Sequence, residues 1–177
     1  MEKVIKRLAI FDFDGTLVDT PVPETAKVKY ESITGKEWPY PGFWSKKESL
    51  DVDMFDMPVI KSVASDYQQE RDRDDTLLVM MTGRIKKLSN LVEGILKSYG
   101  MTFDEYKYKH GAFGNETIQF KVGTLNKYVT NLPHLESIAM WEDRIEHATQ
   151  FSLWGKALER SNGIKFDITL IDSKRHD

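Results

Sequence analysis

Residues 8–17 read Leu-Ala-Ile-Phe-Asp-Phe-Asp-Gly-Thr-Leu, an apolar run that ends in two carboxylates, a glycine and a threonine. The run is typical of a buried strand, and it places Asp12 and Asp14 at the strand's carboxyl end, where ligands bind in open α/β sheets. Gly15 allows a sharp turn close to a ligand, and Thr16 adds a hydroxyl. Two neighbouring acids repel each other unless a proton or a hard cation such as Mg²⁺ shares their charge. The stretch predicts a site at this strand end, although a plain polar turn has the same pattern.

The bulk properties of the chain indicate one globular domain over residues 1–177. The absence of cysteine excludes disulfides, thiolate catalysis and cysteine-ligated zinc, so a metal would be held mainly by oxygen. No apolar stretch approaches the roughly 20 residues that span a bilayer, and charges interrupt the N-terminal segment where a signal peptide would be apolar. We therefore expect a cytoplasmic protein without a membrane partner.

The net charge of −3 gives no overall basic field that would attract nucleic acid. The excess of acidic residues lies between Pro21 and Asp75. Small basic clusters occur elsewhere, and solvated surface charge is the ordinary interpretation of each. These clusters are Lys46-Lys47, Arg84 with Lys86-Lys87, and Lys107-x-Lys109-His110.

Apolar runs alternate with segments of helical period, a pattern that builds a parallel sheet. The predicted strands are Val4–Phe11, Thr76–Met81, Glu105–Lys109, Ser137–Trp141 and Phe166–Ile171. The predicted helices are Thr25–Ile33, Met57–Arg71, Lys86–Tyr99, Thr117–Thr130 and Arg144–Arg160. The third helix is expected to bury Leu88, Leu91, Val92, Ile95 and Leu96, and the last to bury Ile145, Ala148, Phe151 and Ala157. The expected fold class is a doubly wound, mostly parallel five-stranded α/β sheet of Rossmann-like type.

A small insert is expected over residues 21–56, because the connection after the first strand is far longer than an ordinary βα loop. Its second half holds Trp38, Tyr40, Phe43 and Trp44 among prolines and turn residues. Aromatic rings at this density indicate a structured segment, since flexible linkers are polar. Two interpretations remain open, an irregular packing flap and a lid that contacts substrate.

Three further segments supply parts of a phosphate site. The second strand ends in Thr82-Gly83-Arg84, which offers a hydroxyl, backbone N–H groups and a forked cation to phosphate oxygens. Lys121 lies near the start of a predicted helix, where an ammonium group could stabilise a negatively charged transition state, and Lys127 competes for this assignment. The fourth strand ends in Glu142-Asp143. With Asp12 and Asp14, Asp143 would complete an oxygen-rich metal site.

These four segments, in this order, resemble the motifs of the haloacid dehalogenase-like phosphatases over nearly the whole chain. Within that superfamily, Thr20-Pro21-x-Pro23, the aromatic stretch through Trp44, Thr117-x-x-Phe-Lys121 and Trp141-Glu-Asp-Arg144-x-x-His147 resemble the phosphatase-type domain of Swiss Army Knife RNA-repair proteins. More distantly, they are similar to the 3′-phosphatase half of polynucleotide kinase-phosphatase. The fold that the resemblance implies agrees with the one that the strand pattern predicts.

The resemblance also implies a mechanism. Asp12 would be the nucleophile that becomes an aspartyl-phosphate, and Asp14 the acid that protonates the leaving oxygen and then the base that activates water. The phosphate would be bound by Thr82, Gly83, Arg84 and Lys121, and Mg²⁺ by Asp12, the Asp14 backbone carbonyl and Asp143. Thr16, Glu142, Arg144 and His147 are expected around these groups. Glu142 stands where the family often has aspartate, which leaves open whether it contacts metal directly or through water.

The function expected from this resemblance is a Mg²⁺-dependent phosphomonoesterase that removes terminal 3′-phosphates from RNA or DNA, in a repair setting where ligase or kinase activities accompany it. Within enzymes, the alternative is a phosphatase for a nucleotide or sugar phosphate. Outside enzymes, the alternatives are a regulatory phospho-acceptor and a non-catalytic binding module. The order of the motifs favours a phosphatase over a receiver domain, which would carry its phosphorylated aspartate on a later strand.

Overall fold

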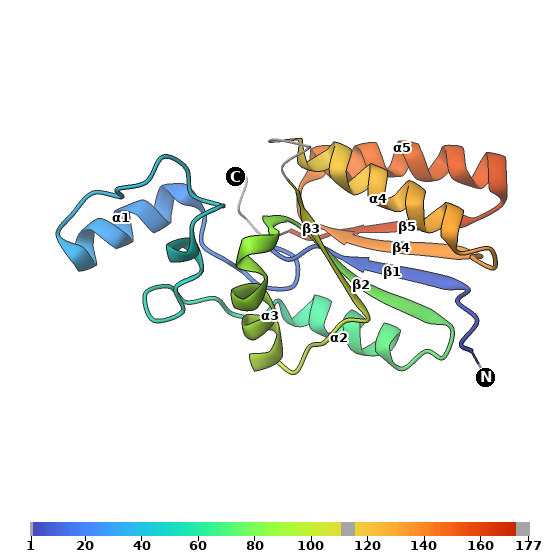
Figure 1. The fold of residues 1–177 in the computed structure, drawn as a ribbon, viewed down its shortest axis with the longest axis horizontal. Coiled ribbons are helices and arrows are strands. Elements are labelled where there is room, and N and C mark those ends of the chain that lie inside the picture. The colour runs from blue at the N-terminus through green and yellow to red at the C-terminus, as the bar shows by residue number, and fades with distance from the viewer. Residues whose placement is uncertain (1, 111–115, 173–177) are drawn as a thin grey trace.

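A computed structural model describes residues 2–110 and 116–172, and a five-stranded sheet in the order β3-β2-β1-β4-β5 forms its centre (Figure 1). The strands are β1 (Arg7–Phe11), β2 (Thr76–Ile85), β3 (Glu105–Lys109), β4 (Ser137–Glu142) and β5 (Lys165–Leu170). Every neighbouring pair runs parallel. Strands β2 and β3 extend the sheet to one side of β1, and β4 and β5 extend it to the other. A topological switch point therefore lies between β1 and β4, and the predicted doubly wound α/β class is confirmed.

Helices cover both faces of the sheet, α2 and α3 on one and α4 and α5 on the other (Figure 1). The helices are α1 (Pro23–Thr34), α2 (Lys61–Arg71), α3 (Ser89–Ser98), α4 (Thr117–Asn131) and α5 (Ile145–Asn162), with 3₁₀ turns at Lys47–Leu50 and Lys86–Leu88. Side chains of successive strand residues alternate between the two cores, so Phe11 packs on the α2 and α3 side and Ile10 on the α4 and α5 side. Among the residues described, no helix combines the length and apolar character needed to cross a membrane.

The predicted elements are all present, but two helix faces differ from expectation. Leu91 is 40% exposed, because it lies at the rim of a groove instead of the core. In α5, Ile145 is 60% exposed and Ala157 is also exposed. The rotation of α5 is set by its contact with β5, where a Cβ on Gly155 would lie only 2.1 Å from the Phe166 ring. The buried face of α5 therefore runs through His147, Ala148, Phe151, Gly155 and Leu158.

The long connection after β1 forms a segment that we call the arm, residues 21–56. It contains α1, which stands beyond the carboxyl ends of the strands and away from the sheet (Figure 1). The only buried residue of α1 is Ala26, so this helix takes little part in the main core. The arm instead has an aromatic cluster of its own, in which the Trp38 ring lies 5.2–5.3 Å from the rings of Tyr30, Tyr40 and Phe43. The dense aromatic stretch is thus structured, as predicted.

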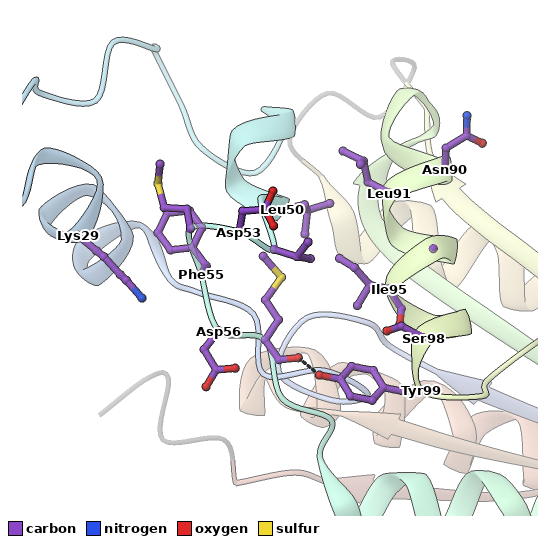
Figure 2. A pocket seen from close by; sticks show the side chains of 14 residues that line it. Lys29, Leu50, Asp53, Phe55, Asp56, Asn90, Leu91, Ile95, Ser98 and Tyr99 are labelled. Atoms are coloured by element: carbon purple, nitrogen blue, oxygen red, sulfur yellow. Dashed lines mark hydrogen bonds between the residues drawn. The ribbon is translucent and has the colours of Figure 1, made fainter. Parts of the chain in front are cut away.

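A groove of about 660 Å³ runs between the end of the arm and α3 (Figure 2). Phe55 and Leu50 line one wall, and Ile95 and Leu91 the other. The Tyr99 hydroxyl donates a hydrogen bond to the Met57 carbonyl and closes one end. The carboxylates of Asp53 and Asp56 at its edge are exposed.

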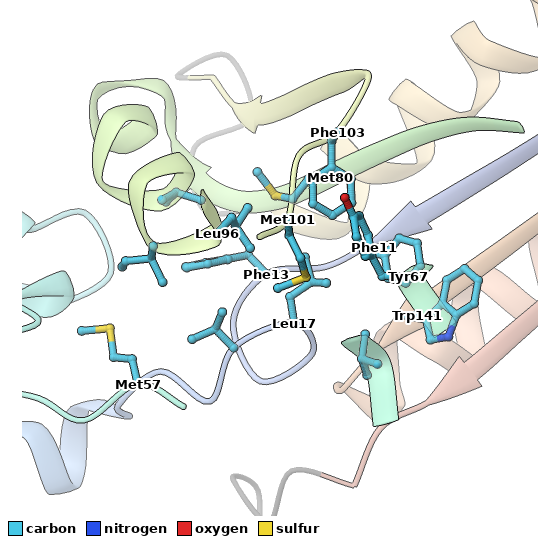
Figure 3. Close-up of a cluster of buried hydrophobic side chains, with 14 of the residues drawn as sticks. Phe11, Phe13, Leu17, Met57, Tyr67, Met80, Leu96, Met101, Phe103 and Trp141 are labelled. Atoms are coloured by element: carbon cyan, nitrogen blue, oxygen red, sulfur yellow. The ribbon is translucent and has the colours of Figure 1, made fainter. Parts of the chain in front are cut away.

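The core under α2 and α3 holds the first and fourth strands in register (Figure 3). Phe11 and Trp141 are Cα partners of β1 and β4, and their rings stack with centroids 4.0 Å apart. The indole N–H of Trp141 also donates to Asp66 of α2, at 2.9 Å. Because the next residues along the two strands are Asp12 and Glu142, this pair of rings places both carboxylates at neighbouring strand ends.

Candidate active site

The predicted catalytic acids line a cavity of about 660 Å³ at the carboxyl edge of the sheet. Its floor is formed by the ends of β1, β2 and β4, one wall by α4 and α5, and the other by the arm. The lining includes Asp12, Asp14, Gly83, Arg84, Lys121, Glu142, Asp143, Arg144 and His147. The charged side chains that line the groove of similar volume beside α3, Lys29, Asp53 and Asp56, are all exposed, so the cavity at the strand ends is the candidate active site.

A buried ion network joins β1, α4 and β4. The Lys121 Nζ donates to Asp12 Oδ1 at 2.9 Å and to Glu142 Oε2 at 2.8 Å. The other Glu142 oxygen, Oε1, accepts the backbone N–H groups of Asp143 and Arg144 at 3.1 and 3.2 Å. Glu142 therefore orients the lysine and also fixes the turn that follows β4. Lys127, the competing candidate, is exposed and does not line the cavity.

The charges of this network do not balance. Burial, and then the charge of Glu142, raise the pKa of Asp12 well above its ordinary value, although Lys121 opposes this. Burial also disfavours the charged form of Glu142, but Lys121 and His147 together outweigh it and hold the Glu142 pKa well below its ordinary value. The charge of Glu142 is thus compensated more fully than that of Asp12. A further positive charge beside Asp12 would relieve the excess.

The residues present fit a divalent cation of the magnesium type. One carboxylate oxygen each from Asp12, Glu142 and Asp143 lies within 4.8 Å of the others. All three residues are buried. Oxygen donors are the ligands that Mg²⁺ prefers, and the uncompensated charge at Asp12 is what such an ion would neutralise. The side chain of Asp14 lies outside this group of three, in keeping with a contribution through its backbone carbonyl only.

Arg84 holds the second acid and the arm together. Its guanidinium donates to both Asp14 oxygens, through Nε at 3.0 and 3.2 Å and through Nη2 at 2.7 Å. Its Nη1 donates to the Trp44 carbonyl at 2.8 Å and to Ser49 Oγ at 2.6 Å. The group is only 2% exposed, and the Trp44 ring covers it at 4.9 Å. Its donors thus point at Asp14 and the arm, and direct contact with phosphate stays a prediction.

The other residues of the second motif shape the turn after β2. Thr82 is fully buried, and its hydroxyl accepts the backbone N–H of Arg84 at 3.0 Å. Gly83, in contrast, lines the cavity. A Cβ at Gly83 would lie 2.8 Å from Thr117 Cγ2, so only glycine lets the first residue of α4 approach this closely. Gly83 is therefore better placed than the Thr82 side chain to meet a ligand.

The residues that were expected around the catalytic groups, besides Glu142, lie in different surroundings. Thr16 is fully buried, and no described residue is a hydrogen-bond partner of its hydroxyl. His147 is buried behind Glu142, with Nδ1 3.9 Å from Glu142 Oε2. Arg144 is exposed at the rim of the cavity.

Several residues of the site were missed by sequence reasoning. Ser49 accepts a hydrogen bond from Arg84, and nothing in the local pattern distinguishes it from an ordinary loop residue. Thr20 donates to Asp14, and it stands in the Thr20-Pro21-x-Pro23 motif, to which no role at the site was assigned. Lys109 lines the cavity although its cluster was interpreted as surface charge. Its place directly at the end of a predicted strand was the signal that could have identified it, because strand ends meet at one edge of the sheet.

Comparison with known proteins assigns the chain to a family. Residues 36–176 match the family described as HAD domain family 1 in Swiss Army Knife RNA repair proteins. The matched range contains Arg84, Lys121, Glu142 and Asp143 of the cavity.

Individual relatives are distant and longer. The chain is 22% identical over 182 residues to the uncharacterized protein YMR265C of Saccharomyces cerevisiae, a match covering 89% of this chain and 39% of the yeast protein. It is also similar to a chain in the structure of the Pnkp1/Rnl/Hen1 RNA repair complex, with a TM-score of 0.59 and 12% identity over 96% of this chain and 44% of that one. A match to a chain in a second structure of the Pnkp1/Rnl/Hen1 complex has the same TM-score and covers 47% of that chain. These structures share the fold, and the chain spans less than half the length of the relatives it matches.

Proposed function

The chain belongs to HAD domain family 1 of Swiss Army Knife RNA repair proteins, and on this premise we propose that its cavity hydrolyses terminal phosphate monoesters of RNA or DNA, with 3′-phosphates as substrate. One observation supports this more than any other. Asp12, paired with Lys121, and Asp14, paired with Arg84, line one cavity at the carboxyl edge of the sheet. In this proposal Asp12 would be the nucleophile, Asp14 the proton donor and Lys121 a cation for the phosphoryl group, and all three line the same cavity.

In the proposed reaction, a carboxylate oxygen of Asp12 attacks phosphorus while the bond to the ester oxygen breaks. Asp14 gives its proton to that oxygen, which leaves as the sugar hydroxyl. Asp14, now ionised, then takes a proton from water, and the resulting hydroxide displaces the aspartyl group and releases inorganic phosphate. Dividing the hydrolysis in this way replaces one difficult step by two easier ones. Lys121 and the backbone at Gly83 lie where they can stabilise charge on the transferring group.

Asp12, Asp143 and the Asp14 backbone carbonyl would hold Mg²⁺, and Glu142 holds Lys121 beside them. When bound, the ion neutralises charge on the phosphoryl group and on the carboxylates. Without an added cation, burial and Glu142 raise the pKa of Asp12, and only the ionised form of Asp12 can attack phosphorus.

Binding of Mg²⁺ should stabilise the folded chain. At a hundredfold excess over its Kd, the ion contributes about 2.7 kcal/mol, which for a domain of this size raises Tm by roughly 5–10 °C. Asp143→Asn should lose most of the increase because it removes a buried ligand oxygen. Asp56→Asn, which changes an exposed carboxylate of the groove, should keep it. Differential scanning fluorimetry with and without EDTA measures the shift, and an undiminished increase in the Asp143 variant would exclude this ligand set.

The arm supports a nucleic-acid substrate through Trp44. This residue is 41% exposed and lines the cavity. Its ring contacts the Arg84 guanidinium and the Phe43 ring. An exposed aromatic ring beside a phosphate site is suited to stacking on a base.

Trp44→Ala should raise KM for a 3′-phosphorylated oligonucleotide far more than KM for a small phosphate ester. Loss of about 1–3 kcal/mol of stacking corresponds to a roughly five- to hundredfold increase for the oligonucleotide. Trp44→Phe, which keeps a ring over Arg84, should give a much smaller increase. Steady-state kinetics on both substrates provide the test, and an equal increase on both would remove the stacking proposal.

A Mg²⁺-dependent phosphate-release panel tests the proposed substrate class. The panel compares 3′- and 5′-phosphorylated RNA and DNA oligomers with mononucleotides, sugar phosphates and a phosphopeptide. We expect the 3′-phosphorylated oligomers to have the highest kcat/KM. A clear preference for mononucleotides or sugar phosphates would favour the small-molecule alternative. Absence of turnover on every ester would favour a non-catalytic module.

A further inference from the structure

Four cations line the active-site cavity, and they differ in their partners. Arg84 and Lys121 each contact buried or partly buried carboxylates. Lys109, at the end of β3, lines the same cavity but forms no ion pair with any described residue. Its Nζ instead lies 3.4 Å from the Thr117 hydroxyl. Partial burial lowers the pKa of Lys109, and the charge of Glu116 only partly opposes this. An additional anion beside Lys109 would therefore be stabilised.

The position of Lys109 relative to the nucleophile suits the next phosphate of a nucleic-acid strand. Thr117, beside Lys109, and Lys121, beside Asp12, are four residues apart on α4 and share one face. One helical turn, about 6 Å along the axis, separates these two positions. The first turn of α4 also carries the positive end of the helix dipole toward this part of the cavity. A strand whose terminal phosphate reaches Asp12 would thus bring its next phosphate to Lys109.

The arm indicates the same path for the nucleic-acid strand, from Asp12 toward Lys109. In the sheet, β2 lies between β1 and β3, so Arg84 and the Trp44 ring above it lie between Asp12 and Lys109. The remaining rim cation, Arg144, follows β4 on the opposite side of β1 and is exposed. A base stacked on Trp44 and a phosphodiester bound by Lys109 can therefore belong to one nucleic-acid strand. Arg144 lies away from that path.

We propose that Lys109, with the Thr117 hydroxyl and the start of α4, binds the phosphodiester adjacent to the terminal phosphate. This assignment rests on the proposed function and narrows its substrate class. The substrate is an oligonucleotide with at least one internal phosphodiester, and a mononucleotide leaves the second phosphate position empty. A charge-assisted contact of this kind corresponds to a roughly tenfold or larger preference.

Binding and turnover together test the proposal. Three probes are compared, a nucleoside 3′-phosphate, a 3′-phosphorylated dinucleotide, and the same dinucleotide with an uncharged methylphosphonate linkage. Affinity is measured by calorimetry in EDTA, and kcat/KM is measured by steady-state phosphate release with Mg²⁺. The wild-type protein should prefer the charged dinucleotide over both other probes by about tenfold or more. Lys109→Gln should remove that preference and weaken the dependence of affinity on salt concentration, because one contact to a phosphate is lost.

Two further variants separate the specific role from a general loss of charge. Lys109→Arg retains a cation and should retain the preference. Lys107→Gln removes a lysine two positions earlier on β3, which pairs with Glu105 and does not line the cavity, and it should behave as wild type. An undiminished preference in Lys109→Gln, or no preference in the wild-type protein, would overturn the proposal. A binding preference without hydrolysis of any probe would leave this anion site in place and refute the proposed phosphatase.

Discussion

Replacing Asp12 with asparagine is expected to abolish phosphate release, with a loss on the order of 10⁴-fold or more, while the fold is retained. The amide has nearly the same shape as the carboxylate, but it cannot serve as the nucleophile. Lys121 would keep its contact with Glu142 at 2.8 Å, so the substitution leaves no unpaired buried cation. Steady-state phosphate release and circular dichroism measure the two quantities. Substantial Mg²⁺-dependent hydrolysis by this variant would contradict the assignment of the nucleophile.

The difference in stability between Asp12→Asn and the wild-type protein is expected to change with pH. Burial and the charge of Glu142 raise the pKa of Asp12 in the folded state, whereas in the unfolded chain it ionises at the ordinary value. As pH rises from that ordinary value through the raised one, the unfolded state releases its proton more readily, and the wild-type protein loses stability. Asparagine does not titrate. In EDTA, the Tm of Asp12→Asn minus that of wild type should therefore increase with pH, and a difference that shrinks with pH would contradict the charge excess.

Replacing Arg84 with lysine is expected to lower kcat on phosphorylated nucleic-acid ends by about 10²-fold or more. The reason is that Arg84 positions Asp14, the proposed general acid, and the substitution disturbs that position. A lysine keeps the charge but cannot make the forked contact to both Asp14 oxygens and also reach the Trp44 carbonyl and Ser49. Arg84→Gln, which leaves Asp14 without its cation, should in addition cost about 3–5 kcal/mol of folding free energy.

The leaving group distinguishes this role from phosphate binding. A sugar hydroxyl is a poor leaving group and needs the proton of Asp14, whereas p-nitrophenolate leaves without one. If Arg84 positions Asp14, Arg84→Lys and Asp14→Asn should both lose much more kcat on the 3′-phosphorylated oligonucleotide than on p-nitrophenyl phosphate. Equal losses on both substrates, accompanied by a large rise in KM for each, would instead indicate that Arg84 contacts the phosphate.

The sequence predicted the parts of the molecule that depend on local pattern. Apolar runs identified the strands, because residues of a doubly wound sheet are buried on both faces, and the strand ends then placed Asp12 beside Asp143. Helix rotation was less predictable. The buried face of α5 follows from the contact of Gly155 with Phe166, a long-range fit that the spacing of apolar residues does not contain.

The partners of the cations were the least predictable feature of the site. Arg84 follows a phosphate-type turn in sequence, yet its donors reach Asp14 and residues of the arm that lie 35 to 70 positions away along the chain. Lys109 appears in a basic cluster like any solvated one, and only the order of the strands brings it into the cavity. Such pairings depend on tertiary structure, and a local motif contains no information about them.

The most direct test of the account is the intact mass of the Asp14→Asn protein after a brief pulse of p-nitrophenyl phosphate with Mg²⁺, because its leaving group departs without the proton of Asp14 and the first step is therefore preserved. Loss of the base that activates water should slow release of the covalent phosphate and allow it to accumulate. We predict a mass increase of one phosphoryl group, located on Asp12 by peptide mapping and absent when Asp12 is also replaced by asparagine. Phosphate formation without any such increase, or a phosphoryl group on another residue, would contradict the claim that Asp12 attacks phosphorus.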